Sequence, residues 1–230
     1  MKKVTTSRIV SPVKGFALLF FLMNFFIVYG IEAQPQLVYS PLIGNLSFPV
    51  AITSANDGSN RLFIVEQGGL IKIYKNGAVL SKPFIDLTNI VQASDLKGLW
   101  SIAFAPNFAV SRTFFVYYID NNGATTLARF KVSNANPDSA ILNSGVVLFS
   151  LPGGATGGPK FGDLHFGNEG YLYLTVSDGS SPSRTTKFAQ DGKTLFGKML
   201  RLNVNVTDAP YYSVPPDNPY ANNPNMRGEI

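Results

Sequence analysis

The chain has one histidine, His165, which is its first candidate for acid–base chemistry because an imidazole titrates near physiological pH. Asp163 lies two residues earlier, in a segment whose apolar residues predict a strand over Phe161–Gly167. Side chains two residues apart share one face of a strand, so the sequence predicts an Asp163–His165 pair opposite Leu164 and Phe166. The alternative is a structural or solvent-exposed histidine without a chemical role.

Other polar candidates lie where predicted strands end. Glu66, Gln67 and Asp178 stand next to glycines, so hydrogen bonds that close turns account for them, with a metal or substrate contact as the alternative. The glycine-rich segment 153–158 could suggest a phosphate-binding loop, but no Gly-Lys-Ser/Thr sequence follows it, which favours an ordinary loop. Lys160, beside this loop, is expected to be solvated rather than to face a pocket.

Aromatic side chains and the cysteine content limit the remaining chemistry. Trp100, Tyr171 and Tyr173 are expected to fill core between sheets, with a sugar-stacking platform as the alternative. The chain has no cysteine, which excludes disulfides and thiolate metal sites. Stability must therefore come from a packed core, for which the 45% hydrophobic residues and 18 phenylalanines are sufficient.

The N-terminal segment carries much of the net positive charge of the chain. Lys2, Lys3, Arg8 and Lys14 precede the apolar run Gly15–Gly30, which predicts an export signal over residues 1–33. The alternative is an uncleaved anchor, although the run is shorter than the ~20 residues that span a bilayer. Without residues 1–33, fifteen basic and thirteen acidic residues remain, which gives no argument for nucleic acid as a partner. We expect a secreted or periplasmic protein with no membrane contact apart from the signal.

Strand-like runs joined by Gly, Asn, Asp and Pro turns dominate from Phe48 onward, and no stretch keeps a helical period for three turns. Three segments repeat the order strand, turn, strand, and they begin about 50 to 60 residues apart. The predicted strands are Phe48–Thr53, Arg61–Glu66, Leu70–Tyr74, Leu99–Phe104, Thr113–Ile119, Leu127–Val132, Phe161–Gly167 and Tyr171–Ser177. This all-β spacing is typical of β-propeller blades, with a two-sheet sandwich as the alternative.

Five blocks, in order, resemble the soluble glucose/sorbosone dehydrogenases, a family that includes PQQ-dependent aldose sugar dehydrogenases. The blocks are residues 57–69 (DGSNRLFIVEQGG), 98–108 (GLWSIAFAPNF), 166–173 (FGNEGYLY), 195–202 (LFGKMLRL) and 215–220 (PPDNPY). The resemblance implies a six-bladed propeller of which this chain covers about the first half. It also implies pyrroloquinoline quinone (PQQ) and calcium as cofactors and a sugar as the substrate.

The resemblance also locates the family's catalytic histidine, which removes a proton from the sugar hydroxyl. Its position falls on Pro159, with Gly158 where some members carry an acid, and a glutamine position of the family falls on Leu96. Proline cannot accept a proton, and His165 stands six residues further on, roughly 20 Å along an extended strand. The prediction is therefore that this chain has no catalytic residue at the family position and no metal ligands, while its cofactor-binding residues stay unknown.

Two functions follow from these observations. One is a quinoprotein sugar dehydrogenase, oxidising a sugar hydroxyl with hydride transfer to PQQ. The other is a catalytically inactive, secreted propeller that binds carbohydrate or a surface protein, since a fold does not fix a function. In both cases the expected organisation is a signal peptide over 1–33 and, over 34–230, the N-terminal part of a propeller truncated at its C-terminus.

Overall fold

The computed structural model describes residues 36–94, 96–152, 160–179 and 188–230. The chain divides into two compact units, 1–42 and 43–230. In the first unit the described residues 36–42 form neither helix nor strand. The described helices and strands all belong to the second unit. No helix among the described residues is long and apolar enough to cross a membrane.

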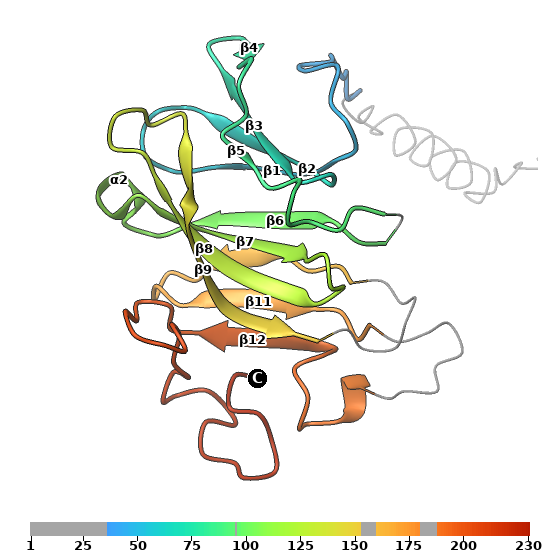
Figure 1. The fold of residues 1–230 in the computed structure, drawn as a ribbon, viewed down its shortest axis with the longest axis vertical. Helices are drawn as coiled ribbons and strands as arrows, with labels where there is room; N and C mark the ends of the chain where they lie inside the picture. The colour runs from blue at the N-terminus through green and yellow to red at the C-terminus, as the bar shows by residue number, and fades with distance from the viewer. Residues whose placement is uncertain (1–35, 95, 153–159, 180–187) are drawn as a thin grey trace, which may run out of the picture. The chain divides into compact units, whose positions relative to one another are not determined.

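The second unit consists of three antiparallel sheets. Its elements are β1 (Pro49–Ser54), β2 (Leu62–Glu66), β3 (Leu70–Lys75), β4 (Ala78–Val79), β5 (Ile85–Asp86), β6 (Leu99–Phe104), α2 (Phe108–Ser111), β7 (Thr113–Ile119), β8 (Thr125–Val132), β9 (Ala140–Leu151), β10 (Leu164–Phe166), β11 (Leu172–Val176), η2 (Phe188–Gln190) and β12 (Lys198–Leu202). We call β1–β5 blade 1, β6–β9 blade 2 and β10–β12 blade 3. Figure 1 shows the three sheets stacked in chain order.

Strand β7 shows why the sheets stack. Phe114, Val116 and Tyr118 belong to an apolar cluster shared with blade 1, while Phe115 and Tyr117 belong to a second cluster shared with blade 3. A strand that is apolar at every position is buried on both faces. Blade 2 is therefore covered on both sides, as in a β-propeller.

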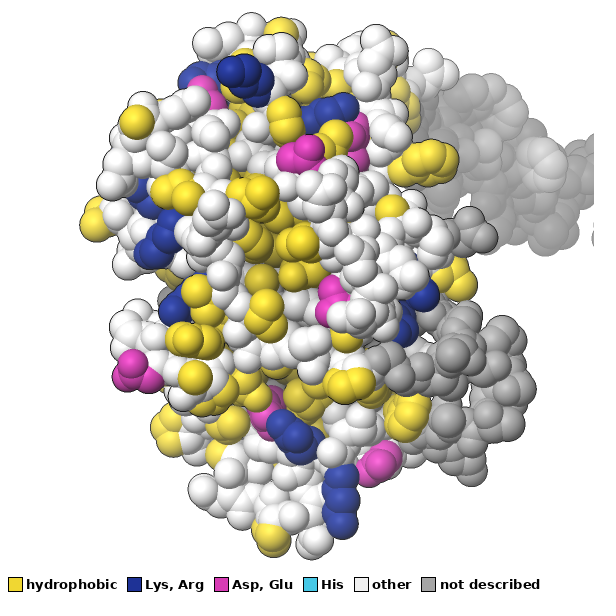
Figure 2. Space-filling model, in the orientation of Figure 1, with side chains coloured by type: hydrophobic (Ala, Val, Ile, Leu, Met, Phe, Trp, Pro, Cys, Tyr) yellow, Lys and Arg dark blue, Asp and Glu magenta, His cyan; other side chains and the backbone are white. Residues whose placement is uncertain are grey.

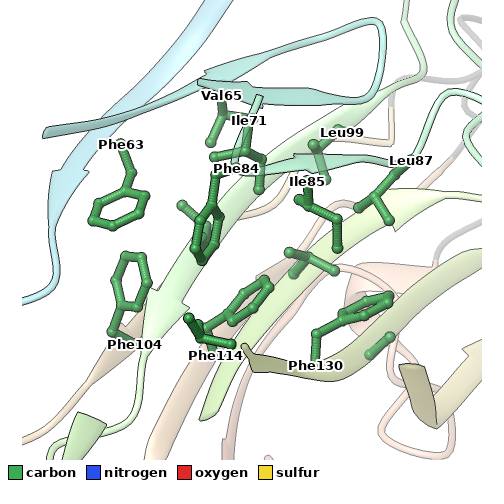
Figure 3. Close-up of a cluster of buried hydrophobic side chains, with 14 of the residues drawn as sticks. Phe63, Val65, Ile71, Phe84, Ile85, Leu87, Leu99, Phe104, Phe114 and Phe130 are labelled. Atoms are coloured by element: carbon green, nitrogen blue, oxygen red, sulfur yellow. The ribbon is translucent and has the colours of Figure 1, made fainter. Parts of the chain in front are cut away.

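Aromatic rings dominate the interface between blades 1 and 2. The rings of Phe63 and Phe104 lie 4.5 Å apart, and Phe84 meets Phe63 edge-on at 4.9 Å. Figure 3 shows these side chains pointing toward one another, with Phe114 and Phe130 continuing the row. Each fully buried ring stabilises the fold by roughly 1.5–3 kcal/mol, so this interface is a large part of the core.

The interface between blades 2 and 3 is mostly aliphatic. Leu164 on β10, Leu172 and Leu174 on β11, and Leu200 and Leu202 on β12 are all buried there. Leucines on consecutive strands of one sheet present a continuous apolar face to blade 2. The first strand of blade 2, β6, contacts both β1 and β10, so the first strands of the three blades are neighbours.

The C-terminal segment returns to the outer edge of blade 3. The backbone N–H of Arg201 donates to the carbonyl of Glu229 at 2.8 Å. The Asn218 amide donates to the carbonyls of Arg201 at 3.0 Å and Gly228 at 2.9 Å. The buried Glu229 carboxylate accepts from the hydroxyl of Tyr212 at 3.0 Å. These bonds satisfy backbone groups of β12 that an open sheet edge would leave unpaired.

The all-β prediction is confirmed, and each predicted strand is present; β6 and β7 have the predicted ends, and the ends of the others differ. The largest change is in β10, which is only Leu164–Phe166 instead of Phe161–Gly167. The sandwich alternative is wrong, because three stacked sheets are present rather than two. Sequence reasoning missed β9 and β12. In β9 the signal was hidden by polar residues and a glycine at 143–145, which this outer strand tolerates because half of its residues are exposed.

Candidate functional site

The end of the blades at which their first strands begin is the place where the family resemblance predicts a site; we call it the mouth. It is formed by Gln67 after β2, residues 96–98 before β6, the β7–β8 turn at 120–124 and Lys160 before β10. Backbone bonds join these pieces, since Leu99 N donates to Gln67 O at 2.9 Å and Ile119 N to Gly98 O at 2.9 Å. The mouth is thus a continuous backbone surface across two blades.

Gln67 fastens blade 1 to the loop that precedes blade 2. Its side-chain Nε2 donates to the carbonyls of Ser94 at 2.8 Å and Lys97 at 3.0 Å. Both amide hydrogens are used in this way, which confirms the predicted turn-closing role. Its neighbour Glu66 is buried and forms an ion pair with Lys72 at 2.8 Å, so sequence reasoning missed its actual partner.

Lys160 is buried at the mouth, which contradicts the prediction of a solvated lysine. Only 4% of its surface is exposed, and its Nζ donates to the carbonyl of Gly123. Burial lowers the pKa of Lys160, repulsion from Lys97 lowers it further, and attraction to Asp120 opposes both. The ammonium is therefore held by the scaffold, where it closes the turn between β7 and β8.

Leu96, one of the two positions that the resemblance marks, lies at the mouth beside Lys160. The backbone N–H of Lys160 donates to the carbonyl of Leu96 at 3.3 Å, and Pro159 directly precedes Lys160 in the sequence. The side chain of Leu96 is apolar, and the residue is 39% exposed. Pro159 and Gly158, with the rest of the loop 153–159, lie outside the described residues. Asp178 follows β11. Because β11 runs antiparallel to β10, Asp178 lies at the mouth end of blade 3.

The predicted Asp163–His165 pair is confirmed. His165 Nε2 lies 2.8 Å from Asp163 Oδ2, and the imidazole is exposed. The other carboxylate oxygen, Oδ1, accepts from the Ser101 hydroxyl on β6 at 2.6 Å. Sequence reasoning missed Ser101, because nothing in the spacing places β6 beside β10 before the blades are stacked.

Electrostatics at Asp163 favour its ionised form. Burial acts to raise the pKa of Asp163, but the hydrogen bonds from Ser101, His165 and the N–H of Leu164 together outweigh it and hold the pKa below the usual value. A carboxylate that stays ionised near neutral pH orients the imidazole through Nε2. The cluster can thus anchor and polarise His165, although it stands apart from the family's base position.

The aromatic candidates divide into two groups. Trp100 packs at the blade 2–blade 3 cluster, as predicted, with its ring 4.7 Å from Phe161 in an edge-on contact. Its buried Nε1 has no hydrogen-bond partner among the described residues. Tyr171 and Tyr173 lie outside both apolar clusters, contrary to prediction. Tyr171 instead lies under the guanidinium of Arg201, 4.6 Å from its ring centre.

The described residues of the mouth do not fit the two cofactors that the resemblance implies. Calcium takes six to eight oxygen ligands, chiefly carboxylates and carbonyls. No group of three or more His, Cys, Asp or Glu that could hold a metal occurs in the described part of the chain. PQQ is a polyanion that calls for free cations, yet Lys160 Nζ donates to the Gly123 carbonyl and Lys97 Nζ to the side-chain oxygen of Gln92 at 2.9 Å.

Comparison with known proteins relates the chain to enzymes and to binding proteins. The family described as Glucose / Sorbosone dehydrogenase matches residues 46–230. Hedgehog-interacting protein of Homo sapiens is 31% identical over 208 residues, which cover 82% of this chain and 29% of that protein. The chain therefore spans less than a third of this relative.

Two solved structures share the fold. A crystal structure of glucose dehydrogenase matches with a TM-score of 0.68 and 25% identity, covering 83% of this chain and 53% of that one. The PQQ-bound aldose sugar dehydrogenase of Streptomyces coelicolor matches with a TM-score of 0.61 and 20% identity, covering 82% and 52%. The stacked blades and the family match agree with each other, and the chain belongs to the glucose/sorbosone dehydrogenase family.

Proposed function

We propose that this protein is a binding member of its family, an exported propeller that recognises another protein and does not itself oxidise sugar. The observation that carries the proposal is the identity of the residues at the family's base and glutamine positions, Pro159 and Leu96. Neither side chain can remove a proton from a hydroxyl. A relative whose name describes an interaction with a protein, Hedgehog-interacting protein, supports a protein partner.

The neighbouring groups support the same reading. Lys160, next to Pro159, donates to the Gly123 carbonyl, so it is not available as a replacement base. His165 is held by Asp163 on the inner strand of blade 3. We further propose that residues 1–33 are an export signal and that 34–230 form the N-terminal part of the propeller. These assignments give the protein access to partners outside the cell.

Cell-surface binding tests this function. The exported form, fluorescently labelled, is added to cells of its source before and after protease treatment, and in parallel after glycosidase treatment. The proposal expects saturable binding that protease abolishes and glycosidase leaves. Loss of binding only after glycosidase treatment would identify carbohydrate as the ligand. The absence of saturable binding would contradict the proposed binding function.

A second candidate function is oxidation of a sugar by the whole protein with PQQ, supported by the family match and by the PQQ-bound neighbour. When bound, PQQ accepts hydride from the substrate. Trp100 is the only tryptophan and lies beside Phe161, at the mouth end of blade 3, so its fluorescence reports on ligands there. Saturable quenching by PQQ in the presence of calcium would favour this candidate, whereas linear quenching favours the binding protein.

A further inference from the structure

A cavity lies at the opposite end of blades 2 and 3 from the mouth. Its volume is about 640 Å³, within the range of small-molecule sites. It lies where β6 and β10 end and β7 begins, and residues 204–207, which follow β12, close one side. It is therefore separated from the family's catalytic end by the length of the blades.

The cavity combines an apolar floor with a polar rim. Phe115 and Phe166 line it and meet edge-on with their ring centres 5.6 Å apart, and the buried Val204 lies beside them. Hydroxyl groups of Ser111 and Ser144 stand on the rim. An apolar base with a few convergent polar groups is the usual composition of a site for a small organic molecule.

Two cations on β8 give the cavity its charge. Arg129 and Lys131 stand two residues apart and share one face of the strand. None of the described residues that line the cavity is an Asp or Glu, and neither cation forms an ion pair within the described part of the chain. An unneutralised pair of cations beside an apolar floor is a setting for an anion.

Scaffold contacts hold both cations in place. Arg129 Nη1 donates to the carbonyl of Val206 at 2.7 Å, and its guanidinium lies 5.2 Å from the ring centre of Tyr211. Among the described residues, Arg129 Nε and Nη2 make no hydrogen bond. Lys131 Nζ donates to Thr113 Oγ1 at 2.6 Å and to the carbonyl of Ser111 at 3.0 Å, which leaves one N–H. A guanidinium fixed at one nitrogen keeps other N–H groups for a carboxylate or phosphate.

Two acids flank the lining in the sequence, Glu169 before Gly170 and Asp208 after Thr207, and neither forms an ion pair with Arg129 or Lys131. Glu169 Oε1 accepts from the Tyr173 hydroxyl at 2.7 Å and lies 3.6 Å from Arg201 Nε. The carboxylate is thus directed to partners on β11 and β12 rather than to Arg129.

We propose that this cavity is a binding site for a small organic anion, a carboxylate or phosphate monoester carried on a compact apolar body. Arg129 binds the charged head, Lys131 adds attraction, and the body rests on Phe115 and Phe166. The site is independent of the chemistry at the mouth, so it holds whether or not the protein oxidises sugar.

Calorimetric titration of the whole protein with four probes tests the proposal. Benzoate and phenyl phosphate each carry a charged head on an apolar ring. Benzyl alcohol has the ring without the charge, and inorganic phosphate has the charge without the ring. The site predicts saturable binding of at least one of the two organic anions, and weaker binding of the other two probes. Benzyl alcohol binding as tightly as benzoate, or inorganic phosphate binding as tightly as phenyl phosphate, would overturn it.

Variants then locate the site. Arg129→Gln should weaken binding by about tenfold or more, because a hydrogen bond to a charged group is lost. Arg129→Lys keeps the charge, so its affinity for the probe should lie between that of Arg129→Gln and that of the unaltered protein. Lys131→Gln should weaken binding about threefold. Lys82→Gln removes an exposed cation that does not line the cavity and serves as the matched control. Equal affinities for Arg129→Gln, Lys131→Gln and Lys82→Gln would refute the assignment.

Discussion

The cations at the two ends of the stacked blades all donate to scaffold groups, but they differ in burial. At the mouth, Lys160 is buried and donates to a backbone carbonyl. At the far end, Arg129 and Lys131 border an open cavity that has no acid among its described lining residues. The lysine at the mouth is thus buried within the scaffold, while the two cations at the far end are more exposed and lie beside a cavity.

The difference teaches that a shared fold preserves packing more readily than chemistry. Buried rings fill the interface between blades 1 and 2 (Figure 3), and buried leucines line the interface between blades 2 and 3. On the face in Figure 2, charged side chains of both signs are scattered around a central group of hydrophobic side chains. A scaffold of this kind can lose one site and keep another, because blade stacking does not depend on either.

The largest expected effect contrasts one glycine at each end. A Cβ at Gly162, near the mouth, would lie 2.4 Å from the carbonyl oxygen of Thr175 and 2.5 Å from the ring of Tyr117. Gly162→Ala should therefore lower the free energy of unfolding by about 3 kcal/mol. A Cβ at Gly170, at the far end, meets no atom within 4 Å, but φ is +88° there, so Gly170→Ala should cost about 1 kcal/mol. Urea denaturation measures both free energies of unfolding. Equal losses of stability would contradict the close packing of Gly162 against Thr175 and Tyr117.

A smaller effect contrasts one lysine at each end. Lys160→Met leaves the Gly123 carbonyl without its donor and should lower the free energy of unfolding by about 1–2 kcal/mol. Lys131→Met removes an exposed cation and should change it by less than about 0.5 kcal/mol. If Lys160→Met stabilised the protein, Lys160 would be a strained functional group and not a scaffold residue.

The smallest effect concerns pH. The pKa of Asp163 is lowered in the folded protein relative to its ordinary 3.8, so the folded state binds this proton less readily than the unfolded state. Its contribution to stability is therefore present above about pH 4 and is lost as the pH falls through the lower, folded pKa. Asp163→Asn should lose less stability than the unaltered protein between pH 4 and more acidic values, measured by thermal unfolding. If the melting temperatures of the two proteins fell in parallel with pH, the Ser101 and His165 contacts would not favour the charged carboxylate.

How much the sequence predicts differs between local and long-range features. The Asp163–His165 pair follows from two-residue alternation, and β7 follows from a continuous run of aromatic and β-branched residues; both are local rules. Ser101 and the buried state of Lys160 depend on β6 lying beside β10 and on the β7–β8 turn, which no local pattern encodes. The far cavity also needs residues from four strands and from the segment after β12, so it became visible only in the folded chain.

The proposed loss of sugar oxidation is tested most directly by steady-state dye reduction. The protein is supplied with PQQ and calcium and assayed with several aldoses beside the Streptomyces coelicolor aldose sugar dehydrogenase as the positive control. The account predicts that the control reduces the dye and that this protein does not differ from the assay without protein. Sugar-dependent dye reduction that saturates with PQQ would contradict it, because Pro159 would then stand at a working active site.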